Sequence, residues 1–164
     1  MADIRVRPAT AADLDAINEI FNHFVERCTC TYQTVRMKPE ERAAWFAAHD
    51  AKHPVIVAER EGVIVGWASL SPFRPQAAYE HTVEDTIYVH EAYQAQGIGS
   101  MLMGNLLVRA KTLGHRTVIA VIDALQTGSI TLHARSGFVE VARLKEVGFK
   151  FGRWLDQVYM QRML

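Results

Sequence analysis

The sequence predicts an α+β fold, in which helices cover a central sheet to form three layers. Three observations support this prediction. Segments with the two-residue period of strands and the 3.6-residue period of helices are intermixed along the 164 residues. Residues 55–70 have the pattern of a hairpin, which makes the centre of the sheet antiparallel. A glycine-containing loop at 94–99 then connects a strand-like segment to an apolar helical one.

The composition is that of one globular domain, residues 1–164, with 49% hydrophobic and 22% charged residues and no linker or internal repeat. The 18 basic and 18 acidic residues cancel, which disfavours nucleic acid or an anionic membrane as a partner and favours small molecules. No apolar run has the length of a transmembrane helix, and the first residues lack the apolar core of a signal peptide. We therefore expect a cytoplasmic protein.

The first third of the chain reads as a strand and two helices. Residues 4–7 alternate as a strand does, and residues 10–13 can cap a helix whose apolar face recurs from Leu14 to Phe24. Pro39 suits the first turn of a second helix, which we expect to end near His49. The long connection between the two helices is expected to line a site, with Tyr32 as its candidate contact, because long loops in compact domains are often functional.

The rest of the chain predicts further strands and helices. Glu61 and Gly62 form the turn of the hairpin, Gly114 ends a helix, and Gly137 closes a shorter one. The expected strands are 55–58, 63–70, 82–89, 117–122, 138–145 and 155–163, the expected helices are 101–113 and 129–135, and the glycine-containing segment 148–154 joins the last two strands.

Cys28 and Cys30 are the only cysteines. A disulfide across one intervening residue is strained, and no second pair completes a four-thiolate zinc site, so we interpret both as free thiols. We expect no metal site.

The loop Gln-Ala-Gln-Gly-Ile-Gly at 94–99 is the strongest functional motif. Its glycines remove side chains where backbone N–H groups converge, and the helix that follows adds the positive end of its dipole. This pattern predicts a phosphorylated ligand, although a plain strand-to-helix turn has the same spacing. The sequence lacks the Gly-x-Gly-x-x-Gly pattern of dinucleotide folds near its start and the Gly-Lys-Ser or Gly-Lys-Thr of Walker loops, which disfavours both.

The element order, this loop and residues 129–138 together resemble the GCN5-related N-acetyltransferases over nearly the whole chain. Residues 78–89 and 147–156 are similar to the phosphinothricin acetyltransferase branch, which also acetylates methionine sulfoximine and methionine sulfone. The resemblance implies the GNAT fold, a mixed and mostly antiparallel sheet of about seven strands flanked by about four helices. In that fold the parallel strands 82–89 and 117–122 splay apart.

The resemblance implies acetyl-CoA as the cofactor, held mainly by backbone groups. N–H groups of residues 96–101 would hold the pyrophosphate, and the edge of residues 87–89 would pair with the pantetheine amides. Gln126 stands where the family commonly has asparagine, so its contact with pantetheine stays open. The expected cofactor-binding residues are Ile87, Tyr88, Val89, Gln94, Ala95, Gln96, Gly97, Ile98, Gly99, Ser100, Met101, Gln126 and Ser129.

The chemistry requires a base, because an amine attacks a thioester only after losing its proton. Glu84 is the candidate, acting directly or through water, and the alternative is a solvent-facing carboxylate. His133 stands where the family commonly has tyrosine and where the branch has histidine. It is a candidate to protonate the CoA thiolate or to assist Glu84, and the alternative is a histidine that does not titrate. No covalent acyl-enzyme is expected.

The expected acceptor-binding residues are Tyr32, Phe73, Arg74, Tyr79 and Glu84, with Arg74 matching the carboxylate of a free amino acid. The competing interpretation of Arg74 is a solvated loop residue, and of the aromatic residues simple packing. Lys150 and Trp154 belong to a segment that in this family lies near a dimer interface, so a homodimer is expected and either residue acts structurally or on the partner.

We therefore expect an acetyl-CoA-dependent N-acetyltransferase of the α-amino group of small amino-acid analogues, acting by direct attack on the thioester. One alternative keeps the fold but changes the acceptor to a protein N-terminus or another amine. The other alternative is a CoA-binding module without turnover.

Overall fold

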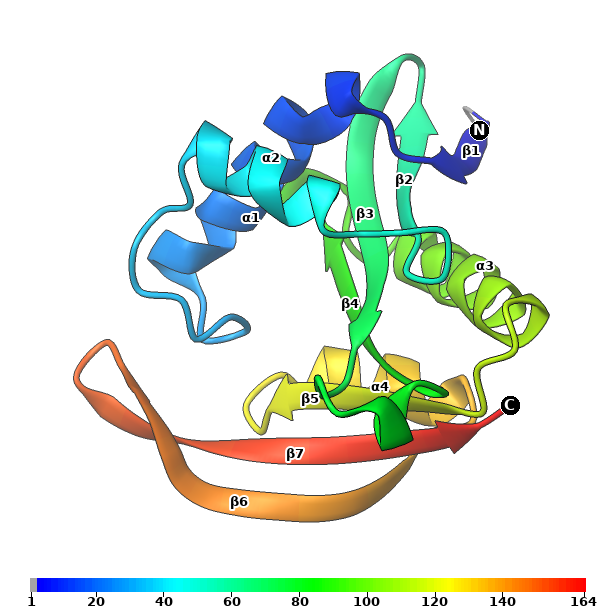
Figure 1. Cartoon of the computed structure of the whole chain (residues 1–164). Coiled ribbons are helices and arrows are strands. Elements are labelled where there is room, and N and C mark those ends of the chain that lie inside the picture. Colours follow the sequence, from blue (N-terminus) through cyan, green and yellow to red (C-terminus); the bar gives the residue numbers. More distant parts are fainter. Residues whose placement is uncertain (1–2) are drawn as a thin grey trace.

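A seven-stranded sheet in the order β1-β2-β3-β4-β5-β7-β6 forms the centre of the computed structural model, which describes residues 3–164 (Figure 1). Its strands are β1 Ile4–Pro8, β2 Val55–Arg60, β3 Val63–Pro72, β4 Thr82–Val89, β5 Thr117–Asp123, β6 Val139–Lys150 and β7 Arg153–Met163. The helices are α1 Leu14–Arg27, α2 Pro39–Ala47, α3 Ile98–Thr112 and α4 Thr127–Arg135, with short 3-10 turns η1 Ala11–Asp13, η2 Ala77–Tyr79 and η3 Glu91–Tyr93. The predicted fold class is confirmed.

The helices cover both faces of the sheet. The α1 and α2 helices pack on one face with Val55, Val57 and Trp67, whereas α3 packs on the other face with the largest apolar cluster (Figure 1). Alternate residues of each strand therefore enter different cores, as the two-residue period requires. Among the described residues, no helix has the length and apolar character needed to cross a membrane.

The α1–α2 face contains a buried arginine. The Arg42 guanidinium lies 4.8, 4.5 and 5.4 Å from the ring centres of Phe21, Trp45 and Trp67, and its Nε donates to Asn18 at 3.2 Å. Burial lowers the pKa of Arg42 to about 10. The aromatic rings stabilise the cation through their negative faces, so Arg42 joins α2 to α1 and the sheet.

The parallel pair β4–β5 separates partway along. The two strands pair only from Thr82 with Thr117 to Glu84 with Ile119. On its other edge, β4 stays paired with β3 as far as Val89 with Gly66. One edge of β4 therefore has no strand partner beyond Glu84, which confirms the predicted splay.

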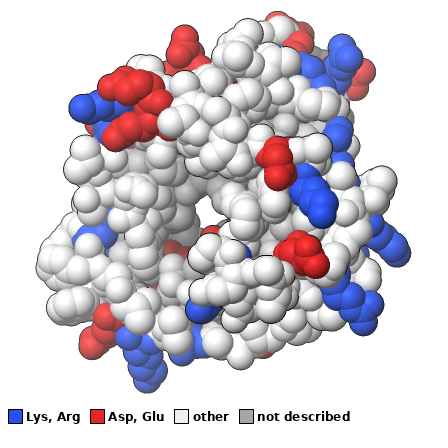
Figure 2. Space-filling model, in the orientation of Figure 1, with Lys and Arg blue, Asp and Glu red and all other residues white. Residues whose placement is uncertain are grey.

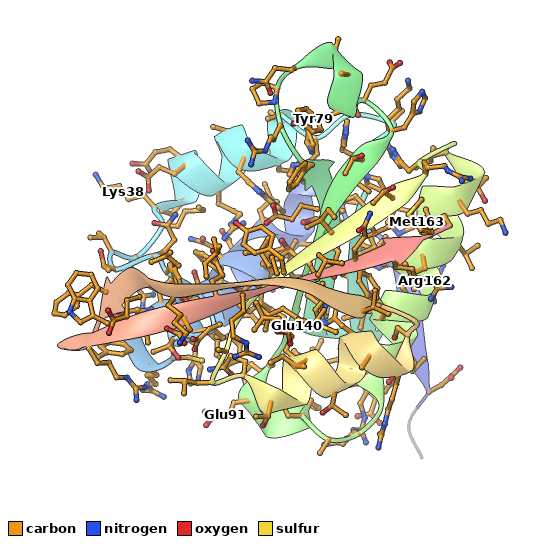
Figure 3. All side chains as sticks on the ribbon, turned by 90° about the horizontal axis from the view of Figure 1, so that it is seen from below. Lys38, Tyr79, Glu91, Glu140, Arg162 and Met163 are labelled. Carbon is orange, nitrogen blue, oxygen red and sulfur yellow. The ribbon has the colours of Figure 1, made fainter. Side chains whose placement is uncertain are left out.

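The last two strands form a longer hairpin than the sequence predicted. Gly148 pairs with Leu155 and Phe149 with Trp154, so most of the expected connection 148–154 is strand. The ladder shifts register between Leu144 and Gly148, where an irregularity interrupts the alternation that a strand prediction relies on. Figure 3 shows β6 and β7 side by side across the molecule, and Figure 1 shows the closed end of the hairpin extending beyond the rest of the sheet.

Candidate active site

A cavity of about 790 Å³ lies where β4 and β5 separate. Figure 2 shows the surface hollowed between the α1–α2 side and the β5–β7 side, with acidic atoms visible inside the hollow. Residues from α1, β4, β5, the glycine loop and α4 line the cavity. Because the opening passes between two strands, a ligand in it is accessible from both faces of the sheet.

The glycine loop forms one end of this cavity. Gly97 has φ +83°, a left-handed conformation that L side chains rarely adopt, and it directly precedes α3. The first N–H groups of a helix have no partner within it, so those of Ile98, Gly99 and Ser100 meet the cavity at the positive end of the dipole. A Cβ on Gly99 would lie 3.2 Å from the Leu132 side chain, so this position has little room for a side chain. A glycine-containing turn at a helix N-terminus is typical of sites that bind anions.

Most of the expected cofactor-binding residues line the cavity, namely Ile87, Tyr88, Val89, Gln94, Ala95, Gly97, Ile98, Gly99, Ser100, Gln126 and Ser129. Gln96 and Met101 lie outside this lining. The Gln96 amide accepts a hydrogen bond from Arg60 at 3.1 Å and donates to the Ala92 carbonyl at 3.3 Å. The Met101 N–H donates to the Gly97 carbonyl within the helix, so it has no proton to offer a pyrophosphate.

Glu84 lines the cavity as the last residue of β4 that pairs with β5. Its side chain shares a sheet face with those of Thr86 and Tyr88, and Tyr88 packs in the α1–α2 core. Burial, and then the charge of the neighbouring Asp85, raise the pKa of Glu84 above its ordinary value. Such a carboxylate is a better proton acceptor than one in water.

His133 lines the cavity but has both ring nitrogens engaged. Its Nε2 lies 2.9 Å from the Asp85 carboxylate, and its Nδ1 lies 2.7 Å from the Ser129 carbonyl. Burial, the largest single effect, lowers the pKa of His133. The hydrogen bond to Asp85, the charge of Asp85 and the hydrogen bond to the Ser129 carbonyl together outweigh burial and raise the pKa above its ordinary value. Two acceptors beside one ring favour the imidazolium, which donates from both nitrogens. This arrangement favours a buried ion pair over proton donation to a ligand.

Gln126 also has partners within the protein. Its Nε2 donates to the Thr29 hydroxyl at 3.3 Å and lies 3.4 Å from the Asp123 carboxylate. The Thr29 hydroxyl donates to the same carboxylate. Gln126 therefore ties α4 to the turn after α1, a role the sequence did not predict.

The expected acceptor residues Phe73, Arg74 and Tyr79 cluster beyond the end of β3, outside the cavity lining. The Arg74 guanidinium lies 5.2 Å from the Phe73 ring centre and 5.9 Å from that of Tyr79. Among residues 3–164, no carboxylate forms an ion pair with Arg74. Figure 3 shows Tyr79 on η2 at the edge of the molecule. The three side chains lie close to one another, and none of them lines the cavity that contains Glu84.

Tyr32 contacts the β6–β7 hairpin rather than the cavity. Its hydroxyl donates to the Asp156 carbonyl at 3.1 Å, and its ring lies where a Cβ on Gly148 would stand. Lys150 is buried beside it, and its Nζ donates to the Cys28 and Thr31 carbonyls at 2.7 and 2.8 Å. Both residues attach the loop after α1 to the hairpin of their own chain.

Among the lining residues that the sequence analysis did not name as members of the site are Asp85, Cys28 and Cys30. Their partners lie far away in sequence or in a loop, so no local period marks them. The sequence also contains a pair of histidines at a spacing typical of metal ligands, His49 and His53. His49 contacts Ser71 and His53 contacts Asp50, and no group in residues 3–164 has three side chains suited to holding a metal ion.

Comparisons with known proteins agree with this geometry. Residues 17–138 match the acetyltransferase (GNAT) family. The chain is 39% identical to the L-amino acid N-acyltransferase MnaT of Escherichia coli, covering 97% of this chain and 93% of the relative. It is 41% identical to a phosphinothricin N-acetyltransferase of Alcaligenes faecalis, covering 97% and 82%. The yncA acetyltransferase of Salmonella typhimurium, solved with acetyl-CoA, superposes with a TM-score of 0.95 at 37% identity, covering 98% and 94%.

Proposed function

Since the chain belongs to the acetyltransferase (GNAT) family, in its phosphinothricin acetyltransferase branch, and is an acetyl-CoA-dependent N-acetyltransferase, we propose that its acceptor is the α-amino group of a small amino-acid analogue. The observation that carries this proposal is a partly buried Glu84 at the point where the two parallel strands separate. The proposed acceptors are of the phosphinothricin, methionine sulfoximine or methionine sulfone type.

The residues present fit acetyl-CoA. The N–H groups of Ile98, Gly99 and Ser100 would hold the pyrophosphate, and the unpaired edge of β4 would bind the pantetheine amides as an added strand does. Bound acetyl-CoA supplies a thioester carbonyl carbon for the amine to attack. Because the edge of β4 and Glu84 belong to one strand, that strand positions the cofactor and the base together.

Glu84 accepts the proton that the acceptor ammonium must lose, directly or through water. Its raised pKa brings its proton affinity closer to that of the amine. Backbone N–H groups along β4 would stabilise the oxyanion of the tetrahedral intermediate. His133, held by Asp85 and Ser129, would position α4 beside the thiolate rather than donate to it. No acyl-enzyme is required.

Arg74 is the proposed partner of the acceptor carboxylate. Its guanidinium lies over two aromatic rings and has no carboxylate partner among the described residues, which leaves its donors free for a ligand. For this contact the exposed segment 73–79 must fold over the mouth of the cavity when an acceptor binds. Phe73 and Tyr79 would then cover the acceptor side chain, whereas Tyr32 would shape the pocket through the hairpin it contacts.

We also propose that the protein is a homodimer that associates through the β6–β7 hairpin. Eight large apolar side chains there are at least 40% exposed: Val139, Val141, Leu144, Val147, Phe149, Phe151, Trp154 and Met163. Apolar residues concentrated on one hairpin are typical of an interface between chains. The expected cytoplasmic location stays a prediction.

The experiment that tests the acceptor is release of CoA thiol from acetyl-CoA in the presence of phosphinothricin, methionine sulfone, ordinary amino acids and short peptides. We expect turnover with the amino-acid analogues. Turnover with peptides alone would contradict the acceptor while leaving the cofactor assignment in place. Acetyl-CoA binding without turnover on any acceptor would favour the non-catalytic alternative.

A further inference from the structure

Two thiols that acetyl transfer does not use lie in the cavity. Cys28 and Cys30 belong to the turn that follows α1, both are partly exposed, and both line the cavity. Phe24, one helical turn earlier, lines it too and packs 5.6 Å from the Tyr88 ring. Tyr88 and Glu84 lie on the same face of β4. The thiols therefore lie on the same side of the splay as Glu84, which is the side proposed to bind the acceptor.

The turn supplies a backbone donor to the Cys28 sulfur and has a cation beneath it. The Cys30 N–H donates to the Cys28 sulfur at 3.0 Å. The buried Lys150 ammonium donates to the carbonyls of Cys28 and Thr31, which places a cation beneath the turn. A thiolate at Cys28 would therefore have a backbone donor and a nearby positive charge, the two features that activate cysteines.

The titratable groups around Cys28 have opposing effects. The Cys30 thiol, as a hydrogen-bond donor, lowers the pKa of Cys28 most, against the effect of burial, and the Cys30 N–H and Lys150 on β6 lower it further. Asp123 on β5 raises it. Desolvation is the largest effect that raises the pKa of the half-buried Tyr88 on β4, and Cys30 and then Cys28 raise it further, against a hydrogen bond with Thr31. The pKa of Cys28 falls to about 6, so its thiolate predominates at neutral pH.

A disulfide between residues two apart closes a small, strained ring, and strained disulfides are easily reduced. Such a bridge is suited to reversible formation rather than to permanent stabilisation. We propose that Cys28 and Cys30 form a peroxide-sensitive thiol pair in the acceptor half of the cavity, and that their oxidation to a disulfide weakens acceptor binding. The second part of this proposal rests on the acetyltransferase function proposed above.

The reaction requires hydrogen peroxide as the oxidant. The Cys28 thiolate attacks one peroxide oxygen, the O–O bond breaks, and hydroxide leaves, which gives a sulfenic acid. This hydroxide becomes water by taking up a proton equivalent to the one that the Cys28 thiol released on ionising. The Cys30 sulfur then attacks the Cys28 sulfur, the S–O bond breaks, and the departing hydroxide takes the Cys30 proton to form water. Two thiols are oxidised by two electrons in total, and one peroxide is reduced to two waters.

The bridge would disturb the cavity wall through Thr29, the residue between the cysteines. The Thr29 hydroxyl donates to Asp123 and accepts from Gln126 at 3.3 Å. Drawing the flanking cysteines together bends the backbone at Thr29 and pulls its hydroxyl from these partners. The acceptor side of the cavity then loses the contacts that fix its shape.

The first test is intact-mass analysis of the full chain treated with hydrogen peroxide. We expect the wild type to lose two hydrogens without linking two chains, and dithiothreitol to reverse the change. In Cys30→Ser the reaction should stop at a sulfenic acid that dimedone traps. In Cys28→Ser the Cys30 thiol should react with peroxide about tenfold more slowly than Cys28 does in the wild type, because this variant has no stabilised thiolate.

The pH dependence of the wild-type reaction needs no variant. Its rate should be half-maximal near pH 6, the pKa of Cys28, rather than near about 8.5, where an unperturbed thiol ionises. No two-hydrogen loss, equal rates in Cys28→Ser and the wild type, or a midpoint near that of a free thiol would each overturn the thiol pair.

Acetyl transfer to methionine sulfone, followed by loss of thioester absorbance, tests the consequence. We expect the KM for methionine sulfone to rise about tenfold in the oxidised protein and to return after reduction. An unchanged KM with the disulfide formed would overturn the effect on acceptor binding. If the reduced protein acetylates no acceptor, the proposed function fails together with this effect, and the mass analysis alone decides on the thiol pair.

Discussion

The Glu84 carboxylate lies between the proposed cofactor site and the proposed acceptor site. It stands where β4 leaves β5, so it borders both the cofactor edge and the acceptor side of the cavity. We expect Glu84→Gln to lower kcat by at least about 100-fold, because the amide cannot accept the proton. Calorimetry should show unchanged acetyl-CoA binding, and Glu61→Gln, at the exposed hairpin turn, serves as the matched control. Full activity in Glu84→Gln would rule out the base.

The pH profile of kcat/KM reports the same group. Glu84 must be ionised to act, and burial raises its pKa. Activity should therefore fall as the pH drops through a value above about 4.3, the ordinary glutamate pKa. A profile whose acidic limb is unchanged in Glu84→Gln, measured with residual activity, would assign that limb to another group.

Asp85 and His133 form the buried ion pair beside the site, with side chains only 1% and 5% exposed. Replacing His133 with leucine leaves Asp85 charged and unpaired, so we expect a loss of about 3–5 kcal/mol in the free energy of unfolding. The double variant Asp85→Asn, His133→Leu removes that charge and should be less destabilised. Urea unfolding measures both, and equal losses would contradict a buried charge pair.

The sign of the pH effect on this pair follows from the raised pKa of His133. Its contribution to stability is complete below about pH 6.5, the unfolded value, and is lost as the pH rises through the folded pKa. The difference in unfolding free energy between the wild type and the double variant should shrink over that interval. A difference that grows with pH would indicate a neutral histidine.

At the scale of elements, the start of α3 determines anion binding. Gly97 has a left-handed backbone, so Gly97→Ala should cost about 1 kcal/mol and weaken acetyl-CoA binding severalfold. Gly104 is the matched control, because it lies within the same helix, where a Cβ meets nothing within 4 Å. Gly104→Ala should raise stability by about 0.5–1 kcal/mol and leave the affinity unchanged. Calorimetry measures the affinity for acetyl-CoA, and thermal unfolding measures the stability of each variant. Equal acetyl-CoA affinities in Gly97→Ala and Gly104→Ala would show that the loop does not contribute to binding.

Most elements could be predicted from the sequence because their signals are local. Pro39 begins α2, and the splay follows from the family resemblance. The length of the hairpin β6–β7 was underestimated because nearly all residues of β6 are exposed, which removes the alternation from that strand. Glu146 also has a positive φ at the irregularity. Here pairing between strands, rather than the pattern of one strand, determines the structure.

The sequence carries signals for the parts of the candidate site that depend on backbone, and none for contacts between distant side chains. The loop at Gly97 and the base candidate Glu84 carry motif signals. The pair Asp85–His133 spans 48 positions, and the Lys150 contact with the Cys28 carbonyl spans 122, so no sequence window contains either. Arg74 was expected at the acceptor, but its side chain lies outside the cavity lining, so its proposed contact requires the loop 73–79 to move.

For the whole molecule, the exposed apolar hairpin predicts association. We expect sedimentation at twice the 18.5 kDa mass of one chain. Trp154→Glu should shift the protein to the monomer, because a charge on a buried interface lacks a partner. Val63→Glu is the control, since Val63 is 54% exposed at the start of β3, which β4 and β5 separate from the hairpin in the sheet. A wild type that sediments as a monomer at all concentrations would contradict the dimer.

The acceptor is the central claim, and a competition experiment tests it most directly. Equal amounts of free methionine sulfone and of a peptide with the same N-terminal residue share one reaction with acetyl-CoA, and mass spectrometry quantifies the two acetylated products. Acetylation of the free amino acid at its α-nitrogen, with little peptide product, is the predicted result. Preferential acetylation of the peptide would show that the carboxylate is not recognised and would contradict the proposed function.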